Sequence, residues 1–378
     1  MSGPIPDDLL RWVEVDVEAL TDNARLIASL VRPARVMAMV KSNGYGHGLA
    51  IAARAALDGG ATWLGVYTPQ EALALRGAGF EARILVLGWS PPSVHRALVD
   101  AGVDVSVFDP EAVRSLAEAA GAAGTAARVH VKIDTGLHRL GVLPEALESM
   151  AAVLRAAGGD LEVAGLFTHF ADAGVDAAFT DEQHARFLEA VEVLRPVARE
   201  ALLHTSGSAS VIAHPSTHHD LVRCGIALYG YPPVPAPAPL RLGMHVFARV
   251  VQLRTVAAGE TVGYGRTWRA ETPRRIATVA IGYGQGLPRA LSSRGHMAIR
   301  GRRCPIAGIV SMDQVTLDVT DHDGVSVGDA AMFIGERDGV RIGADDVGDL
   351  TGTLPHEILC GIAEGIPRLP RPAAAALP

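Results

Sequence analysis

Lys41 stands at the end of an unbroken apolar run and in front of a glycine-rich turn. The run, Val36–Val40, shows no alternation of apolar and polar residues, which is typical of a strand buried on both faces. Gly44, Gly46 and Gly48 then allow a sharp turn before an alanine-rich helix that we expect to begin near His47. The pattern holds a primary amine at the mouth of a strand-to-helix turn, where it could act as a base or as a covalent anchor. The ordinary alternative is a solvated lysine, and the glycine spacing matches neither the phosphate-binding loop nor the dinucleotide fingerprint.

Other polar side chains also follow apolar strands. The reactive groups of a parallel α/β barrel gather at the carboxyl ends of its strands, so residues in these positions are candidates for one site. Each has a structural alternative, since His169 could be a buried core histidine and Lys132 could pair with Asp134. A hydrolase with a metal bound near Lys132, His169 and His204 is a further alternative. The candidates are Lys41, Lys132 with Asp134, Arg139, His169, His204 with Ser208, and Arg223.

The segment that carries these residues alternates apolar strands with Ala- and Leu-rich helical stretches. Proline followed by an acidic residue marks several helix starts, as at Pro69–Glu71 and Pro110–Glu111. Strand-then-helix units repeated eight times in about 200 residues suit a closed (β/α)8 TIM-like barrel. Periodicity alone leaves an open doubly wound sheet as the alternative. The predicted strands cover residues 36–40, 62–67, 84–88, 103–108, 128–133, 163–167, 201–204 and 222–228.

A proline run at Tyr231–Leu240 separates this segment from the rest of the chain. We therefore predict an α/β barrel over residues 12–240 and a mostly β C-terminal domain over residues 241–370, which the strand near residues 12–16 could join. We expect one closing helix at Leu354–Ile366 and a disordered tail at Arg368–Pro378. The strands predicted in the second domain cover residues 247–253, 275–281, 296–299, 305–310, 314–319 and 330–333.

Composition narrows the class of protein. With 49% hydrophobic residues, 20% charged residues and a net charge of -7, the chain can bury large cores and offers no basic footprint for nucleic acid. A small-molecule partner or a second copy of the chain is therefore expected. No apolar run approaches the roughly 18 residues of a membrane span, and the first residues do not resemble a secretory signal. Cys224, Cys304 and Cys360 are widely spaced, which favours a reducing cytoplasm over a disulfide framework.

The Lys41 segment resembles the lysine motif of the alanine racemases; it reads Val-Met-Ala-Met-Val-Lys-Ser-Asn-Gly-Tyr-Gly-His-Gly. The resemblance extends over nearly the whole chain, from about Trp12 to Arg368. It implies a barrel followed by a β domain, pyridoxal 5'-phosphate bound covalently through Lys41, no metal, and a head-to-tail homodimer with shared active sites. The implied reaction interconverts L-alanine and D-alanine in the cytoplasm, supplying D-alanine for cell-wall precursors.

A second segment, Thr261-Val-Gly-Tyr264-Gly, resembles the one that carries the family's second catalytic base. Inverting the α carbon requires one base on each face of the substrate. The resemblance assigns the D enantiomer to Lys41 and the L enantiomer to Tyr264, which in the family reaches the site from the partner subunit. We expect Arg139 and His169 to bring positive charge to this site.

The resemblance also assigns roles to the remaining candidates. The segment from Lys132 to Arg139 is similar to one whose lysine is often carbamylated and whose arginine lies beside the substrate carboxylate. Val222–Gly230 is similar to the segment whose arginine faces the cofactor's pyridine nitrogen, here Arg223. By this match the cofactor-binding residues are Lys41, Tyr45, His169, Ser208, Arg223, Gly225, Ile226 and His356, and the substrate-binding residues are Arg139, Tyr283, Met312 and Asp313.

Three positions depart from the family pattern. His356 replaces a phenolic tyrosine, Gly207 replaces an asparagine before Ser208, and Gln285 follows Gly284 where the family has Ala-Asp. A racemase of the same fold acting on serine or another amino acid is therefore the alternative prediction. A related decarboxylase is disfavoured because nothing replaces the tyrosine-bearing segments, and a cofactor carrier without turnover is disfavoured by the long second domain.

Overall fold

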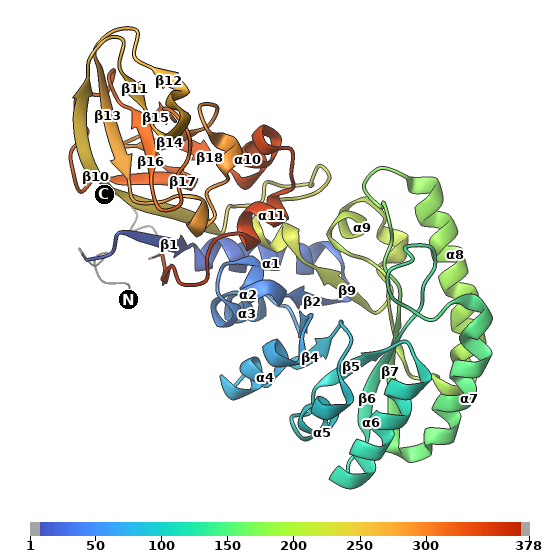
Figure 1. The fold of residues 1–378 in the computed structure, drawn as a ribbon. Coiled ribbons are helices and arrows are strands. Elements are labelled where there is room, and N and C mark those ends of the chain that lie inside the picture. Colours follow the sequence, from blue (N-terminus) through green and yellow to red (C-terminus); the bar gives the residue numbers. More distant parts are fainter. Residues whose placement is uncertain (1–7, 372–378) are drawn as a thin grey trace, which may run out of the picture. The chain divides into compact units, whose positions relative to one another are not determined.

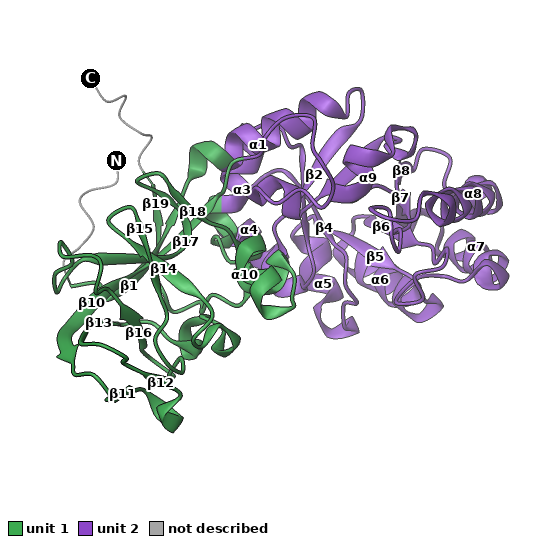
Figure 2. Cartoon of the chain, turned by 90° about the horizontal axis from the view of Figure 1, so that it is seen from above, with its two compact units in different colours: residues 1–19, 45–51, 241–378 green, residues 20–44, 52–240 purple. Residues whose placement is uncertain are grey.

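The computed structural model describes residues 8–371, and the chain divides into two compact units (Figure 2). The barrel unit comprises Leu20–Gly44 and Ala52–Leu240. The β unit comprises the chain up to Ala19, the short segment Tyr45–Ile51, and the chain from Arg241 onward.

The strands of the barrel unit form one parallel sheet in the order β8-β7-β6-β5-β4-β3-β2-β9. The end strands β8 and β9 are joined by backbone hydrogen bonds, from Asp220 N to Leu203 O (3.1 Å) and from Arg223 N to Ser206 O (2.8 Å). The sheet therefore closes, which confirms the predicted eight-stranded barrel over the open sheet. The strands are β2 (Arg35–Met39), β3 (Trp63–Val66), β4 (Arg83–Val86), β5 (Asp104–Val107), β6 (Ala127–Lys132), β7 (Leu161–Phe167), β8 (Leu202–His204) and β9 (Leu221–Cys224).

Helices α4 to α8 lie on the outside of these strands (Figure 1). Their starts are set by short-range capping: the Thr68 side chain accepts from Glu71 N, and the Asp109 and Asp176 side chains cap α6 and α8. None of the described helices has both the length and the apolar character needed to cross a bilayer. The helices are α1 (Val17–Leu30), α3 (Leu49–Asp58), α4 (Pro69–Gly77), α5 (Pro92–Asp100), α6 (Pro110–Ala123), α7 (Leu147–Ala157), α8 (Ala177–Leu194) and α9 (Ser208–Ala213).

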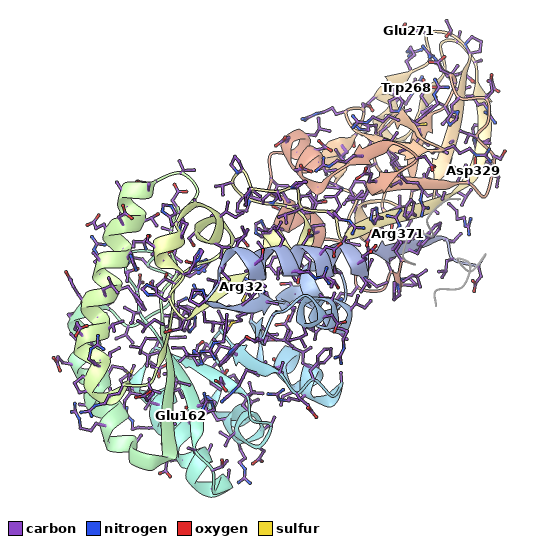
Figure 3. All side chains as sticks on the ribbon, turned by 180° about the vertical axis from the view of Figure 1, so that it is seen from behind. Arg32, Glu162, Trp268, Glu271, Asp329 and Arg371 are labelled. Carbon is purple, nitrogen blue, oxygen red and sulfur yellow. The ribbon has the colours of Figure 1, made fainter. Side chains whose placement is uncertain are left out.

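The β unit is mostly strand, as predicted. Strand β1 (Arg11–Val15) pairs antiparallel with the long β10 (Met244–Val256), and the Trp12 ring stacks on Phe247 with centroids 5.5 Å apart. Trp268, labelled in Figure 3, covers a small apolar cluster that includes Val262 and Ile276. The other elements are β11 (Thr261–Val262), β12 (Trp268–Arg269), β13 (Arg274–Val279), β14 (His296–Ile299), β15 (Arg302–Pro305), β16 (Val315–Asp318), β17 (Ala330–Arg337), β18 (Val340–Ile342), α10 (Ala344–Thr351), α11 (Pro355–Cys360) and β19 (Arg368–Pro370).

Near the C-terminus the structure corrects two predictions. The expected helix at 354–366 ends at Cys360, because Arg368 draws the following carbonyls into a loop: its Nη1 donates to Ala363 O, Glu364 O and Ile366 O. Arg368–Pro370, expected to be disordered, forms β19 and pairs parallel with β1. The rest of the predicted tail, from residue 372, lies outside the described residues.

A third correction concerns the strand predicted at 305–310. The strand β15 lies earlier, at Arg302–Pro305. It is the second arm of a hairpin whose turn residues Arg300 (φ 45°) and Gly301 (φ 72°) both have the positive φ that a two-residue hairpin turn requires. The adjacent arginines Arg302 and Arg303 conceal this strand from a search for apolar runs.

Candidate active site

The backbone after Lys41 forms a single left-handed turn, labelled α2 (Lys41–Tyr45). Ser42 (φ 53°), Asn43 (φ 53°) and Tyr45 (φ 50°) all take a conformation that costs a non-glycine residue roughly 1–2 kcal/mol. The carboxylate of Glu71 holds the turn, since Oε1 accepts from Ser42 N (2.6 Å). Its Oε2 accepts from Tyr67 N and Thr68 N at the start of α4. The predicted sharp turn is present, but no sequence pattern indicated that three non-glycine residues would adopt its left-handed conformation.

Cationic side chains gather at the carboxyl ends of the barrel strands. Burial, together with the charges of Arg223, Arg139, Lys132 and Lys41, lowers the pKa of His169 to about 3. These groups are therefore close enough to act on one another. His169 is neutral near neutral pH, which corrects the expectation that it adds positive charge to the site.

Lys132 is buried against the ring of Phe167, and burial together with the charges of Arg139 and Arg223 lowers its pKa to about 8. Lys132 and Asp134 form no ion pair among the described residues, although the Asp134 charge opposes this lowering of the Lys132 pKa. Asp134 Oδ1 instead accepts from Gly136 N (2.9 Å) and His138 N (3.1 Å) and so shapes the loop that leads to Arg139.

Lys41 and Lys132 are the only lysines in the sequence, so any reaction of a lysine amine in this chain can be assigned to one of two side chains.

Arg223 is 4% exposed, and its terminal nitrogens are committed to the protein. Nη1 donates to His204 O (2.6 Å) and Nδ1 (3.0 Å), and Nη2 donates to Thr168 O (2.6 Å) and Thr205 O (2.9 Å). Nη2 also lies 3.2 Å from His169 Nδ1. Nε makes no hydrogen bond within residues 8–371. One N–H of a buried cation is thus left for an acceptor that the protein does not supply.

Ser208 begins helix α9 and collects backbone donors. Its Oγ accepts from Gly225 N (3.0 Å) and Ala227 N (3.4 Å), and Ile226 lies between them. Converging N–H groups beside a hydroxyl suit an anionic group such as a phosphate. Gly207 allows the His169 ring to pack close to the backbone before Ser208, because a Cβ at position 207 would lie only 3.2 Å from His169 Cε1.

The β unit carries the other predicted site residues on exposed loops. Tyr264 is 73% exposed, Met312 57% and Tyr283 44%. The Tyr283 and Met312 loops are pressed together, with Tyr283 N donating to Ser311 O (3.0 Å). Gln285 Nε2 donates to Asp313 Oδ1 (2.9 Å), so one departure from the family pattern contacts a predicted substrate residue.

Tyr45 and His356 contact each other within the β unit, with ring centroids 6.0 Å apart. Gly46 brings their segments together, since a Cβ there would lie 2.3 Å from Leu359 O and its φ is 80°. Arg368 Nε donates to Gly46 O (3.0 Å) and fixes the same contact.

Several residues of the barrel interior were not predicted as site residues. Asp104 and His130 are fully buried and lead to His204 through hydrogen bonds. A signal existed, because each of these two polar residues stands between two valines within a predicted strand. Within the described chain, no three His, Cys, Asp or Glu side chains come together as a metal site would need.

Comparison with known proteins identifies relatives over the whole chain. The family model for the alanine racemase N-terminal domain matches residues 15–233, and that for the C-terminal domain matches residues 243–370. An alanine racemase of Symbiobacterium thermophilum is 40% identical, covering 94% of this chain and 96% of its own. The crystal structure of alanine racemase from D-cycloserine-producing Streptomyces lavendulae superposes with a TM-score of 0.92 at 33% identity, covering 98% of both chains. A Bartonella henselae alanine racemase, described with covalently bound pyridoxal phosphate, has a TM-score of 0.86 at 27% identity over 96% of this chain and 100% of its own.

Proposed function

Because the chain belongs to the alanine racemase family, we propose that it interconverts L-alanine and D-alanine with pyridoxal 5'-phosphate as cofactor. The observation that carries the proposal is the cation cluster of the barrel unit, in which Lys41, Lys132, Arg139 and Arg223 act together on His169. Such a cluster suits a ligand with a phosphate and a carboxylate.

The side chains and backbone of the barrel unit fit this cofactor. Lys41 would hold its aldehyde carbon, and Ser208 with the N–H groups of Gly225 and Ala227 would hold its phosphate. The Nε–H of Arg223, which has no partner in the described chain, would face the pyridine nitrogen. When bound, pyridoxal phosphate withdraws electrons from the α carbon of the amino acid and makes its proton acidic.

Two bases are then required, one on each face of the α carbon. Lys41 would move the proton on one face. Tyr264 would move it on the other, with its phenol oxygen as the base. At 73% exposure Tyr264 is poorly enclosed by its own chain, which supports a head-to-tail homodimer in which the phenol completes the site of a second copy.

Arg139 would bind the substrate carboxylate. It is exposed, yet its charge acts on both Lys132 and His169, so it lies at the open side of the cation cluster. A cytoplasmic location is proposed because Cys224, Cys304 and Cys360 form no disulfide within residues 8–371, which suits a reducing compartment.

A second candidate is a racemase for serine or another polar amino acid. The hydrogen bond between Gln285 and Asp313 favours it, because it places an amide among the predicted substrate loops. Gly207 and His356 add to this case as departures from the family pattern.

The two candidates are separated by measuring α-proton exchange in D2O across a panel of amino acids. We expect the largest kcat/KM with alanine, and a larger value for serine would favour the second candidate. Borohydride reduction of the holoenzyme should fix the cofactor on Lys41 and leave Lys132 unmodified. Label on Lys132, or exchange with no amino acid, would contradict both candidates.

Variants test the two bases individually. Lys41→Ala should abolish racemisation, whereas Tyr264→Phe should lower it by about 100- to 10,000-fold, the usual contribution of a positioned base. Tyr264→Phe should still exchange the α proton of D-alanine, because Lys41 remains. Tyr67→Phe is the control, since Tyr67 is likewise an exposed tyrosine, at 50%, and its hydroxyl has no proposed role.

A further inference from the structure

A row of buried polar side chains runs through the interior of the barrel. Asp104 on β5 lies 3.2 Å from His130 on β6, between Oδ2 and Nε2. His130 Nδ1 lies 2.9 Å from Nε2 of His204 at the end of β8. His204 Nδ1 lies 3.0 Å from Nη1 of Arg223 on β9. Asp104, His130 and His204 are fully buried, so water does not compete for these contacts.

The chemistry of the two ends fixes the direction of every hydrogen bond. Arginine has only donors, so Nδ1 of His204 must be the bare nitrogen and its proton must sit on Nε2. His204 therefore donates to His130 Nδ1, which leaves the proton of His130 on Nε2, facing the carboxylate of Asp104. Burial keeps the pKa of His204 well below its usual value, in agreement with a single proton on this ring.

Two arginines anchor the far end of the row. Arg83 Nη1 lies 3.3 Å from Asp104 Oδ1, and Arg128 Nε lies 3.4 Å from Oδ2. Arg128 also pairs with Glu162, which is labelled in Figure 3 and is half exposed. Asp104 is therefore held as an acceptor at the end of the barrel where Glu162 and Arg128 meet solvent.

At the near end the row meets Arg223, a buried cation whose Nε–H has no hydrogen-bond partner among the described residues. Arg223 can present that N–H in a single direction only if both terminal nitrogens stay on their acceptors. The carbonyls of His204, Thr168 and Thr205 supply part of this restraint. The other two acceptors are imidazole nitrogens, His204 Nδ1 and His169 Nδ1, whose ability to accept depends on where each ring carries its proton. Of these two histidines, His204 is the one that belongs to the row.

We propose that Asp104 and His130 are positioning residues that fix the tautomer of His204 and thereby orient the guanidinium of Arg223 toward the pyridine nitrogen of the cofactor. The inference rests on the proposed function, and neither Asp104 nor His130 touches the cofactor or substrate. If Asp104 and His130 served only to stabilise the fold, replacing either one should lower stability and leave the tautomer of His204 unchanged.

Asp104→Asn changes the first residue of the row while keeping the shape of its side chain. Arg83 lies on the Oδ1 side and should attract the single amide oxygen, while Arg128 keeps Glu162 as its partner. The NH2 group then takes the Oδ2 side and faces His130. His130 must then accept at Nε2 and carry its proton on Nδ1, and His204 is driven to carry its proton on Nδ1, against Arg223. The control is Ser106→Ala on the same strand, whose buried hydroxyl has no hydrogen-bond partner within the described chain.

Ring 15N shifts of selectively labelled histidine, assigned with single histidine variants, report the tautomers directly in apoenzyme and holoenzyme. We expect Nε2–H forms for His130 and His204 in the wild type and in Ser106→Ala, and Nδ1–H forms in Asp104→Asn. The ratio of pyridoxamine phosphate formed to alanine racemised should rise about 10-fold or more in Asp104→Asn, as outer hydrogen-bond partners commonly contribute 10- to 100-fold. Unchanged tautomers, an unchanged ratio, or an equal rise in Ser106→Ala would overturn the proposal.

A pair of variants at His204 separates positioning from packing. His204→Gln can accept from Arg223 through Oε1 and donate to His130 through Nε2, so it should keep the low ratio of pyridoxamine phosphate formed to alanine racemised. His204→Leu can do neither and should raise this ratio. Equal ratios in the two variants would contradict the proposal. If the wild type bound no pyridoxal phosphate, the proposed function would fail. The tautomers of His130 and His204 in the apoenzyme would still show whether Asp104 fixes the proton positions along the row.

Discussion

The ammonium nitrogen of Lys132 lies 5.8 Å from the centre of the Phe167 ring. Burial there, with the charges of Arg139 and Arg223, lowers the pKa of Lys132 to about 8, so a large neutral fraction is present at pH 8. A neutral amine can add to CO2 and release a proton, which turns the cation into a carbamate anion. We predict that Lys132 is carbamylated and that 13C NMR of enzyme treated with 13CO2 shows one side-chain carbamate.

The assignment is testable because the chain has only two lysines. Lys132→Gln should remove the carbamate signal, while Lys41→Ala should leave it. A carbamate that persists in Lys132→Gln, or the absence of any carbamate at pH 8, would refute the prediction.

Replacing Arg223 with glutamate should raise transamination. A guanidinium keeps its protons and leaves the pyridine nitrogen unprotonated, whereas a carboxylate would favour the protonated ring, which is the stronger electron sink. Incubating Arg223→Glu with L-alanine should accumulate pyruvate and pyridoxamine phosphate, followed by absorbance and chromatography. Arg223→Gln should fall between this variant and the wild type, and a failure to accumulate pyridoxamine phosphate would count against the assigned role of Arg223.

Removing the hydroxyl of Ser208 should weaken cofactor binding. The hydroxyl joins the Gly225 and Ala227 N–H groups in the proposed phosphate site, and one such hydrogen bond contributes about 1 kcal/mol. Ser208→Ala should therefore raise the Kd of the apoenzyme for pyridoxal phosphate by about fivefold. Ser206→Ala is the matched control, because that hydroxyl donates to Thr217 O on the other side of helix α9 and its loss should affect stability instead. Equal Kd values for Ser208→Ala and the wild type would rule out the contact.

Acid should destabilise the fold through its buried histidines. Burial, aided by Arg371 and Arg337, lowers the pKa of His245 to about 3, whereas an unfolded histidine titrates near 6.5. Between these values the unfolded chain binds more protons, so the free energy of unfolding falls as pH drops from about 6.5 toward 3. Replacing His245 with glutamine, which can still accept from Glu336 N, should reduce this slope by about 1.4 kcal/mol per pH unit.

Denaturant unfolding of the wild type and His245→Gln at several pH values measures this slope. The two proteins should differ by a constant above pH 7, where both states of His245 are neutral. Parallel curves down to about pH 4 would show that His245 does not contribute.

Most barrel strands could be predicted because they are short apolar runs bounded by glycine, proline or a charged residue, as Val36–Val40 is by Lys41. The candidate cluster around Lys41 and Arg223 could be found because strand ends of a barrel converge. Arg368 shows why other features could not be predicted: its side chain folds residues 362–366 by donating to backbone carbonyls just before it in the chain, an arrangement that apolar periodicity does not encode. The inward direction of Asp104 and His130 likewise depends on closure of the sheet.

The left-handed turn after Lys41 has a consequence for any attempt to transplant this motif. Its unfavourable backbone angles are maintained by Glu71, which belongs to the next strand-helix unit. A synthetic peptide with the sequence of residues 35–48 would relax to ordinary angles, and its amine would point in no fixed direction. Grafting residues 35–48 onto a foreign scaffold would therefore transfer the sequence of the motif but not the orientation of the Lys41 amine. The graft would also need a carboxylate in the place of Glu71, supplied by a neighbouring strand-helix unit.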